Sequence, residues 1–281
     1  MQINTLTLLH PGNMGATVGA AVRGARVLWV SEGRREESRR RAIEAGLAEA
    51  ATLAEAVRES DAVLSVCPPH AAEEVARDVA DLGFAGLYVD ANAVSRETAQ
   101  RVGAVVAKAG ARFVDGGIIG QPVRTPGTTR LYLSGTGAES VAALFSGGPL
   151  DARVIDGGPG AASALKMTYA AWTKGSDALI LAVRALAASE GVEAALLEEW
   201  AASQPALGNK SERAAAVAAP KGWRYVGEME EIAASFESAG LPAGFHKAAA
   251  ELYERLAPFK DRTDPGPEVK EVVEVLATRR R

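Results

Sequence analysis

The sequence is poor in cysteine and histidine. Its 281 residues include one cysteine, Cys67, and three histidines, His10, His70 and His246. A single cysteine excludes an internal disulfide and predicts a cytoplasmic protein, and Cys67, at the end of the apolar run "LSVCPPH", is interpreted as a small buried hydrophobe. The histidines are scattered without the spacing of metal ligands, so no metal site is expected.

A strong excess of charge and long hydrophobic runs are also missing. The formal net charge of −4 gives no reason to expect a nucleic-acid or membrane-surface partner. Charged residues interrupt the alanine-rich stretches before they reach membrane-spanning length, and the first residues lack the basic start and apolar core of a signal peptide. The composition, 48% hydrophobic and 23% charged, is typical of a soluble globular protein.

The first half of the chain alternates short apolar runs with amphipathic segments. The apolar runs predict strands at residues 3–10, 25–31, 62–68, 86–92, 111–118 and 128–135. Helices are predicted between them at residues 14–24, 34–46, 70–83 and 95–110. Helices that connect buried strands favour a mostly parallel sheet of the Rossmann type.

The second half has a helical pattern throughout. A run without proline covers residues 161–191, and further helices are predicted at 193–203, 211–219, 226–240 and 243–259. We therefore expect an α/β domain at residues 1–156 and an all-helical domain for substrate binding and dimerisation at 157–281. One small domain would cover a helix this long poorly, so we expect it to be buried in the interface of a homodimer.

The stretch "LTLLHPGNMGATVG" (residues 6–19) predicts a dinucleotide-binding turn, although the G-x-G-x-x-G pattern has His10 at its first glycine. A strand precedes the turn, a helix follows it, and a second strand comes about twenty residues on. Gly12 would let the backbone approach a pyrophosphate, Gly15 would permit close helix packing, and the helix N-terminus would face the phosphates. Pro11 can set the turn instead of the missing glycine. The alternative is a strand, turn and helix without a ligand.

Four residues after the second strand bear on the choice of nucleotide. Ser31, Arg34 and Arg35 supply a hydroxyl and two guanidinium groups, which suit a 2′-phosphate. We therefore expect NADP rather than NAD. Glu32 is the residue that favours the opposite preference, because a carboxylate there would accept hydrogen bonds from a ribose diol. Alternatively, the arginines belong to a solvated, charged helix.

Several motifs together resemble a known family. "PGNMG", "LSVCPP", "VDANAVS", "FVDGGIIGQP", "GTTRLYLSG" and "GPGAASALKMTY" have the order and spacing of the β-hydroxyacid dehydrogenases, which include 3-hydroxyisobutyrate and 6-phosphogluconate dehydrogenases. "WTKGSDALILA", "WRYVGEMEEIA" and "LPAGFHKAAAELY" look like a narrower branch, whose C-terminal domain is phosphogluconate-dehydrogenase-like and of unknown function. The resemblance implies a Rossmann-type fold and a nicotinamide cofactor.

The resemblance also implies roles for individual residues. The residues expected under the pyrophosphate are Gly12, Asn13, Met14 and Gly15. Those expected near the ribose and nicotinamide are Cys67, Pro68, Pro69 and Asn92. Lys166 matches the catalytic lysine of the family. Hydride transfer at a carbon that bears oxygen needs a proton partner, and a lysine whose pKa is lowered by burial can act as that general acid or base. The alternative is a lysine that reaches solvent from the helix.

Departures from the family pattern affect the expected substrate site. Helical spacing places Tyr169 and Thr173 on the side of Lys166, and Tyr169 stands where the family has asparagine, so it either holds the substrate oxygen or packs in the core. The substrate loop, S-G-G in the family, ends here in Gly120 and Gln121. Glu228 is a further substrate-binding candidate, for which helix packing or a solvated face is the alternative.

We therefore expect an NADP-dependent oxidoreductase that acts on a small hydroxy or oxo compound, with Lys166 as general acid or base. Imine reduction is an alternative, which Lys166 disfavours because imine reductases of this architecture typically lack the lysine. A regulatory protein that binds NADPH without turnover also remains open, because the substrate residues differ from the family pattern.

Overall fold

The computed structural model describes residues 2–278. The chain divides into two compact units between Met167 and Thr168, and each unit is described by itself. This division lies within helix α7 (Ala161–Ser189), whereas the predicted boundary at residue 156 lies in the loop before that helix.

Within the described residues, the first unit contains an eight-stranded sheet. In sheet order the strands are β3 (Ala48–Ala50), β2 (Arg26–Val30), β1 (Thr5–Leu9), β4 (Ala62–Ser65), β5 (Leu87–Asp90), β6 (Arg112–Gly120), β7 (Thr129–Ser134) and β8 (Asp151–Val154). Strands β1 to β6 are parallel, and β7 is antiparallel to β6. The predicted Rossmann-type sheet is confirmed, and its strand order reverses between β1 and β4, where such folds bind nucleotides.

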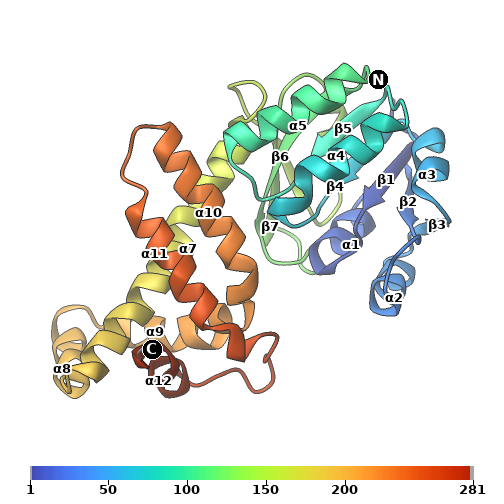
Figure 1. Ribbon diagram of the computed structural model, residues 1–281. Helices are drawn as coiled ribbons and strands as arrows, with labels where there is room; N and C mark the ends of the chain where they lie inside the picture. The colour runs from blue at the N-terminus through green and yellow to red at the C-terminus, as the bar shows by residue number, and fades with distance from the viewer. Residues whose placement is uncertain (1, 279–281) are drawn as a thin grey trace. The chain divides into compact units, whose positions relative to one another are not determined.

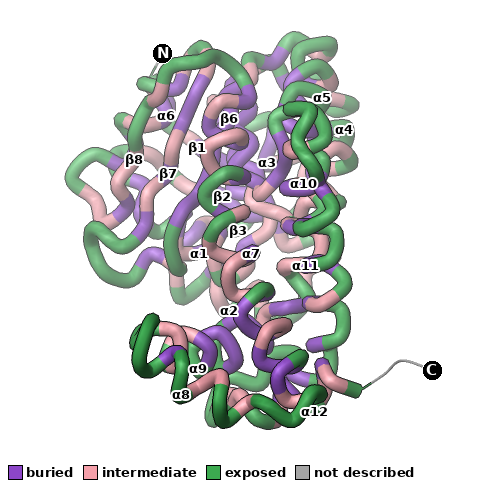
Figure 2. The backbone as a smooth tube through the Cα atoms, turned by 90° about the vertical axis from the view of Figure 1, so that its left-hand side faces the viewer, coloured by how far each residue is buried: buried purple, intermediate pink, exposed green. Residues whose placement is uncertain are grey.

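Helices cover both faces of this sheet. They are α1 (Asn13–Ala20), α2 (Glu36–Glu44), α3 (Leu53–Glu59), α4 (Ala72–Asp81), α5 (Arg96–Lys108) and α6 (Ala138–Ala143). One core cluster joins the sheet to α1, α2 and α6, and a second joins the other face to α3, α4 and α5. Figure 1 shows α4 and α5 side by side over that second face. The strands between the two helical layers are largely buried, as the purple segments in Figure 2 show.

Four elements of this unit were not predicted: β3, β8, α3 and α6. The short strand β3 reads only Ala-Glu-Ala and pairs with β2, so it depends on its neighbour rather than on a hydrophobic pattern of its own. Helix α3 begins with a capping box, in which the Thr52 hydroxyl accepts from the Glu55 N–H and the Glu55 carboxylate accepts from the Thr52 N–H.

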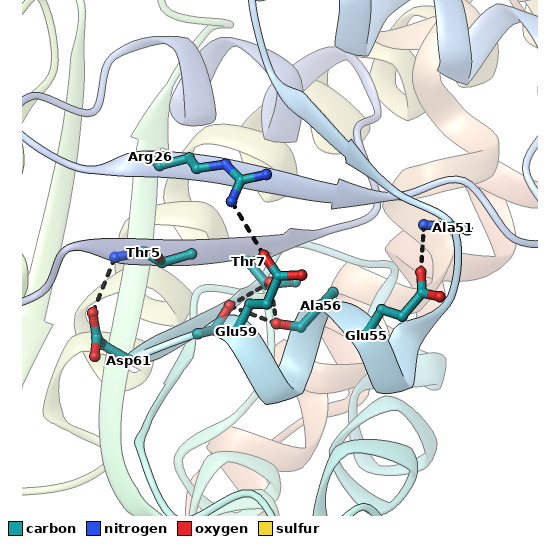
Figure 3. A network of polar contacts seen from close by, with 9 residues as sticks. Thr5, Thr7, Arg26, Ala51, Glu55, Ala56, Glu59 and Asp61 are labelled. Carbon is teal, nitrogen blue, oxygen red and sulfur yellow. Dashed lines mark hydrogen bonds and ion pairs between the residues drawn. The ribbon is translucent and has the colours of Figure 1, made fainter.

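A polar network fixes the amino ends of the central strands (Figure 3). Asp61, just before β4, accepts a hydrogen bond from the Thr5 N–H at 3.0 Å. Arg26, the first residue of β2, pairs with Glu59 at the end of α3 at 3.1 Å. These contacts join the amino ends of β1, β2 and β4 to each other. The opposite, carboxyl edge carries the predicted nucleotide turn.

The second unit is helical, and no strand occurs among its described residues, as predicted. Besides the C-terminal part of α7 it contains α8 (Glu193–Ser203), α9 (Ala206–Ala218), α10 (Gly222–Ser238), α11 (Gly244–Arg255) and α12 (Val269–Ala277). Helices α10 and α11 pack against each other, with Met229 and Ile232 of α10 and Tyr253 of α11 buried. Helix α12 was not predicted, although its apolar side is buried.

Candidate functional site

The turn after β1 keeps the tight form of a dinucleotide-binding turn without its first glycine. His10 itself adopts the left-handed conformation, with φ of 68°. The Gly12 N–H donates to the His10 carbonyl at 2.7 Å and closes the turn. Pro11 was expected to set the turn in place of the missing glycine, whereas in the structure His10 takes the conformation that glycine normally supplies. For a residue with a Cβ, this costs about 1–2 kcal/mol.

The two remaining glycines of the turn have different surroundings. A Cβ on Gly15 would lie 2.5 Å from the His10 carbonyl oxygen, so only glycine lets α1 pack this close to the turn. A Cβ on Gly12 would meet no atom within 4 Å, so the space beside Gly12 is open. Gly12 is also the N-cap of α1, and no side chain caps this helix. The start of α1, including Asn13 and Met14, therefore offers its positive dipole end to an anion.

The loop after β2 separates the two arginines that the sequence grouped together. Arg34 is half-buried, and its charge acts on both His10 and Cys67, which follow β1 and β4. Burial lowers the pKa of the Arg34 guanidinium. Arg35 is exposed and is the N-cap residue of α2. Arg34 thus belongs to the carboxyl edge of the sheet, whereas Arg35 faces solvent.

Nearby, Ser31 and Glu32 follow β2 directly. The Ser31 hydroxyl lies 3.5 Å from the Ala50 carbonyl at the end of β3, and Glu32 is exposed.

Asn92 connects the loops after β4 and β5. Its side-chain oxygen accepts from the Cys67 N–H, its amide nitrogen donates to the Ser65 hydroxyl at 3.1 Å, and its own N–H donates to Asp90 at 2.9 Å. The Asn92 amide is therefore engaged within the protein, where it positions the Cys67 loop. Burial raises the pKa of the Cys67 thiol to about 12, so the thiol stays protonated and is no nucleophile at neutral pH. Pro68, the next residue, is exposed at the rim.

The beginning of α7 packs directly on β6. A Cβ on Gly117 would lie 2.6 Å from the Ala162 carbonyl oxygen and 3.1 Å from the Lys166 Cβ. The absence of a side chain at Gly117 therefore lets α7 approach the strand and hold Lys166 against it. Gly117 lies two residues beyond Asp115, the partner of the last residue of β5, so Lys166 stands past the carboxyl end of β5. Lys166 is half-buried.

Asp115 is a functional candidate that the sequence interpretation missed. Its carboxylate is fully buried on β6 and accepts hydrogen bonds from the Ser134 hydroxyl at 3.0 Å, the Ser163 N–H at 3.0 Å and the Ser163 hydroxyl. The negative charge also faces the N-terminus of α7, where it is favourable. Asp115 therefore fixes the turn of α7 that precedes Lys166. The signal was an aspartate inside an apolar strand pattern, "FVDGGII".

The predicted substrate loop leaves β6 at Gly120. This glycine has φ of 133°, and a Cβ there would lie 2.4 Å from the Thr128 carbonyl oxygen. Gln121 is exposed, and its carbonyl accepts from the Thr129 hydroxyl. The loop then returns to α1, where the Val123 N–H donates to the Thr17 hydroxyl at 2.9 Å. Gln121 therefore lies on a loop attached to the helix of the nucleotide turn.

Three predicted substrate residues belong to the second unit. Tyr169 is exposed, so it does not pack in the core of this chain. The Thr173 hydroxyl donates to the Tyr169 carbonyl at 3.3 Å within α7. Glu228 is mostly buried and pairs with Lys174 at 2.9 Å, so it is not on a solvated face. Lys174, which sequence reasoning did not single out, offsets the negative charge of Glu228.

Residues 2–278 lack two features that would point to another type of site. They contain no group of three or more histidine, cysteine, aspartate or glutamate side chains arranged to hold a metal ion. None of the helices in this range has the length and apolar character that crossing a membrane requires.

Comparison with known families matches both units. Residues 7–145 match the NAD binding domain of 6-phosphogluconate dehydrogenase, and residues 187–256 match a domain of unknown function, DUF1932. An uncharacterized 28.5 kDa protein from Methanothermus fervidus, named for its place in the 7S RNA 5′ region, is 32% identical over 168 residues. That match covers 59% of this chain and 64%, less than two thirds, of the relative.

Solved structures share the fold over nearly the whole chain. A conserved protein of unknown function, described as similar to 3-hydroxyacid dehydrogenases, is 25% identical with a TM-score of 0.68, covering 90% of this chain and 97% of that one. Mycobacterium tuberculosis 3-hydroxyisobutyrate dehydrogenase with L-serine is 19% identical with a TM-score of 0.70, covering 99% and 100%. A reductive aminase from Aspergillus terreus with NADPH and ethyl levulinate is 19% identical with a TM-score of 0.56, covering 98% and 99%. Residues 7–145 therefore belong to the family of NAD-binding domains of 6-phosphogluconate dehydrogenase, and the chain as a whole has the fold of the 3-hydroxyacid dehydrogenases.

Proposed function

We propose that the protein is an NADP-dependent oxidoreductase that transfers a hydride between the nicotinamide and a small hydroxy or oxo compound. The observation that carries the proposal is the position of Lys166, held against β6 at Gly117 beyond the carboxyl end of β5. This is the same edge of the sheet as the turn formed by His10, Gly12 and Gly15. A nucleotide turn and a proton-transferring group on one edge suit hydride transfer.

The residues at this edge fit a dinucleotide. Open space beside Gly12 and the uncapped start of α1 suit a pyrophosphate. Arg34 is half-buried, and its Nε is buried with no hydrogen-bond partner among residues 2–278. A 2′-phosphate would supply the missing acceptor. Asn92 would act through the Cys67 loop rather than by direct contact, because its amide is already engaged.

The chain supplies the proton chemistry. When bound, the nicotinamide gives or receives the hydride. During reduction the Lys166 ammonium would donate a proton to the carbonyl oxygen of the substrate, and during oxidation the Lys166 amine would accept the hydroxyl proton. The hydrogen bonds between Asp115 and Ser163 fix the turn of α7 that precedes Lys166. The backbone that carries the Lys166 side chain is therefore held in place. Gly117 keeps the helix close enough for this placement.

The proposed substrate is a small polar molecule with a hydroxyl or carbonyl group, and the residues of the second unit proposed to select it are Tyr169, Thr173 and Glu228. Two structures of the same fold were solved with L-serine, a hydroxy acid, and with ethyl levulinate, a keto ester. Both ligands carry the type of oxygen function that Lys166 would serve. Because Lys174 offsets the charge of Glu228, this part of the site does not select strongly for a cationic substrate.

Imine reduction is a second candidate, favoured by the similarity of fold to a reductive aminase. Oxidation of NADPH with a panel of aldehydes, ketones and cyclic imines separates the candidates. Turnover of carbonyl compounds supports the proposal, and turnover of cyclic imines alone supports imine reduction. NADPH binding without turnover of any compound supports a regulatory protein.

We also propose a cytoplasmic location, because a single cysteine suits a reducing compartment.

Replacing Arg34 with alanine is expected to raise the Kd of NADPH by about 10- to 100-fold, because a charge-assisted hydrogen bond to the 2′-phosphate is lost. The Kd of NADH should change little. Arg35→Ala is the matched control, and its effect should be much smaller because Arg35 is exposed at the start of α2. Titration monitored by intrinsic tryptophan fluorescence measures the Kd of NADPH and of NADH for the natural protein and for both variants. Tighter binding of NADH than of NADPH by the natural protein would contradict the NADP preference.

We also propose a homodimer formed through α7. Trp172, Leu179 and Leu186 recur every seven residues on one side of this helix and are 72%, 50% and 61% exposed. Burying this stripe against a second copy would remove large apolar side chains from water.

The substitution Leu179→Glu is expected to convert the dimer to a monomer, because a carboxylate would have to be buried in the interface. Multi-angle light scattering after size-exclusion chromatography gives the mass. The control is Leu241→Glu, since Leu241 is equally exposed at 53% but lies in the loop between α10 and α11. A monomeric mass for the natural protein would refute the dimer.

A further inference from the structure

His10 occupies a position where glycine would be unstrained. Its φ of 68° lies in the left-handed region, and the turn is otherwise that of a dinucleotide site. Gly15 still packs against the His10 carbonyl, so the backbone of the turn has kept its tight form. The histidine therefore adds strain and an imidazole, and strain at such a position points to a role for the side chain.

The His10 imidazole and the Arg34 guanidinium interact electrostatically at the carboxyl edge of the sheet, and His10 follows β1, where the strand order reverses. Each residue is half-buried, and the charge of Arg34 acts on His10. The His10 Nδ1 and the Arg34 Nε are both buried with no well-formed hydrogen bond to any residue in the range 2–278. Buried polar atoms in proteins are normally hydrogen-bonded. Two such atoms on neighbouring side chains mark a place for a shared acceptor.

The charge state of the pair suits an anion. Burial and the nearby Arg34 charge lower the pKa of His10 to about 4, with a smaller opposing effect from the Leu9 carbonyl. At neutral pH the imidazole is uncharged and offers one N–H donor, while the guanidinium carries the positive charge. Cys67, the other titratable group that acts on Arg34, is a protonated thiol and does not compete for the guanidinium as an anion.

We propose that His10 is a specificity-determining residue, which holds the 2′-phosphate of the adenosine ribose together with Arg34. This inference rests on the proposed NADP-dependent function. His10 follows β1 and Arg34 follows β2, so the two side chains would grip the phosphate from two sides. The guanidinium would supply the positive charge together with its own N–H donors, and the imidazole would add one further donor.

The test uses two small probes that differ only in the 2′-phosphate, adenosine 2′,5′-bisphosphate and adenosine 5′-monophosphate. Isothermal titration calorimetry of the natural protein and of His10→Gly gives both affinities. The variant is expected to bind the bisphosphate about tenfold more weakly and the monophosphate unchanged, because one hydrogen bond to a charged group is lost. Its Tm should be equal or higher, since glycine relieves the left-handed strain.

The variant His10→Asn keeps a side-chain N–H donor at a residue that tolerates the left-handed region, so it should recover part of the bisphosphate affinity. If His10→Gly binds both probes as tightly as the natural protein does, or if its affinity for both falls by the same factor, the proposed role of His10 is overturned. If the natural protein binds neither the bisphosphate nor NADPH, the proposed function itself fails.

Discussion

Replacing Lys166 with alanine is expected to lower kcat by about 10²- to 10⁴-fold, the usual contribution of a general acid or base. NADPH affinity should stay nearly unchanged, because Lys166 lies at the start of α7 on β6 rather than at the nucleotide turn. The measurement is steady-state oxidation of NADPH with the best substrate of the panel, together with fluorescence titration of the cofactor.

Two controls separate a chemical role of Lys166 from a structural one. Lys166→Arg keeps the positive charge but cannot release a proton at neutral pH, so its kcat should be nearly as low as that of Lys166→Ala. Added methylamine should restore part of the activity of Lys166→Ala, because a free amine can occupy the space of the missing side chain. A folded Lys166→Ala variant that keeps most of its turnover would refute the role as general acid or base.

Replacing Asp115 with alanine is expected to lower the free energy of unfolding by about 3 kcal/mol, because buried donors of Ser134 and Ser163 lose their acceptor. For a chain of this size the Tm should fall by about 5–10 °C. Thermal unfolding followed by circular dichroism measures the change. Asp115 should also affect kcat more than the affinity for NADPH, because it holds the turn of α7 that leads to Lys166.

Asp115→Asn is the matched control, since it keeps the volume and one side-chain acceptor but removes the charge that faces the start of α7. It should lose less stability than Asp115→Ala. Ser134→Ala should lower the free energy of unfolding by about 2 kcal/mol, the value of one hydrogen bond to a charged group. If Asp115→Ala has the same Tm and the same kcat as the natural protein, the Asp115 carboxylate neither stabilises the fold nor positions Lys166.

Arg34 and His10 are proposed to bind the adenosine half of the cofactor. Lys166 and Asp115 are proposed to serve proton transfer and its positioning. Variants of the first pair should change the affinity for the adenosine half while kcat at saturating cofactor stays close to normal. Variants of the second pair should change turnover while cofactor affinity is kept. Independent effects of this kind are expected because the pairs stand after different strands, β1 and β2 in one case and β6 in the other.

Local patterns in the sequence determined the class of the protein. Apolar runs of strand length alternating with amphipathic segments were sufficient for the parallel sheet, because buried parallel strands and crossover helices each need a pattern that is visible within a few residues. The spacing of Gly12 and Gly15 after β1 was sufficient to predict a nucleotide-binding turn. The helical pattern from residue 161 onward likewise indicated an all-helical second part.

Only the tertiary structure decided which of the candidate residues meet. The sequence cannot distinguish Arg34 from Arg35, because burial depends on the path of the loop over neighbouring strands. It also hides the partnership of Asp115 with Ser134 and Ser163, residues 19 and 48 positions away that meet only when α7 packs on β6. The strain at His10 has the same origin: the backbone of the turn is imposed by the packing of α1 on β1, and the side chain must accept the conformation that remains.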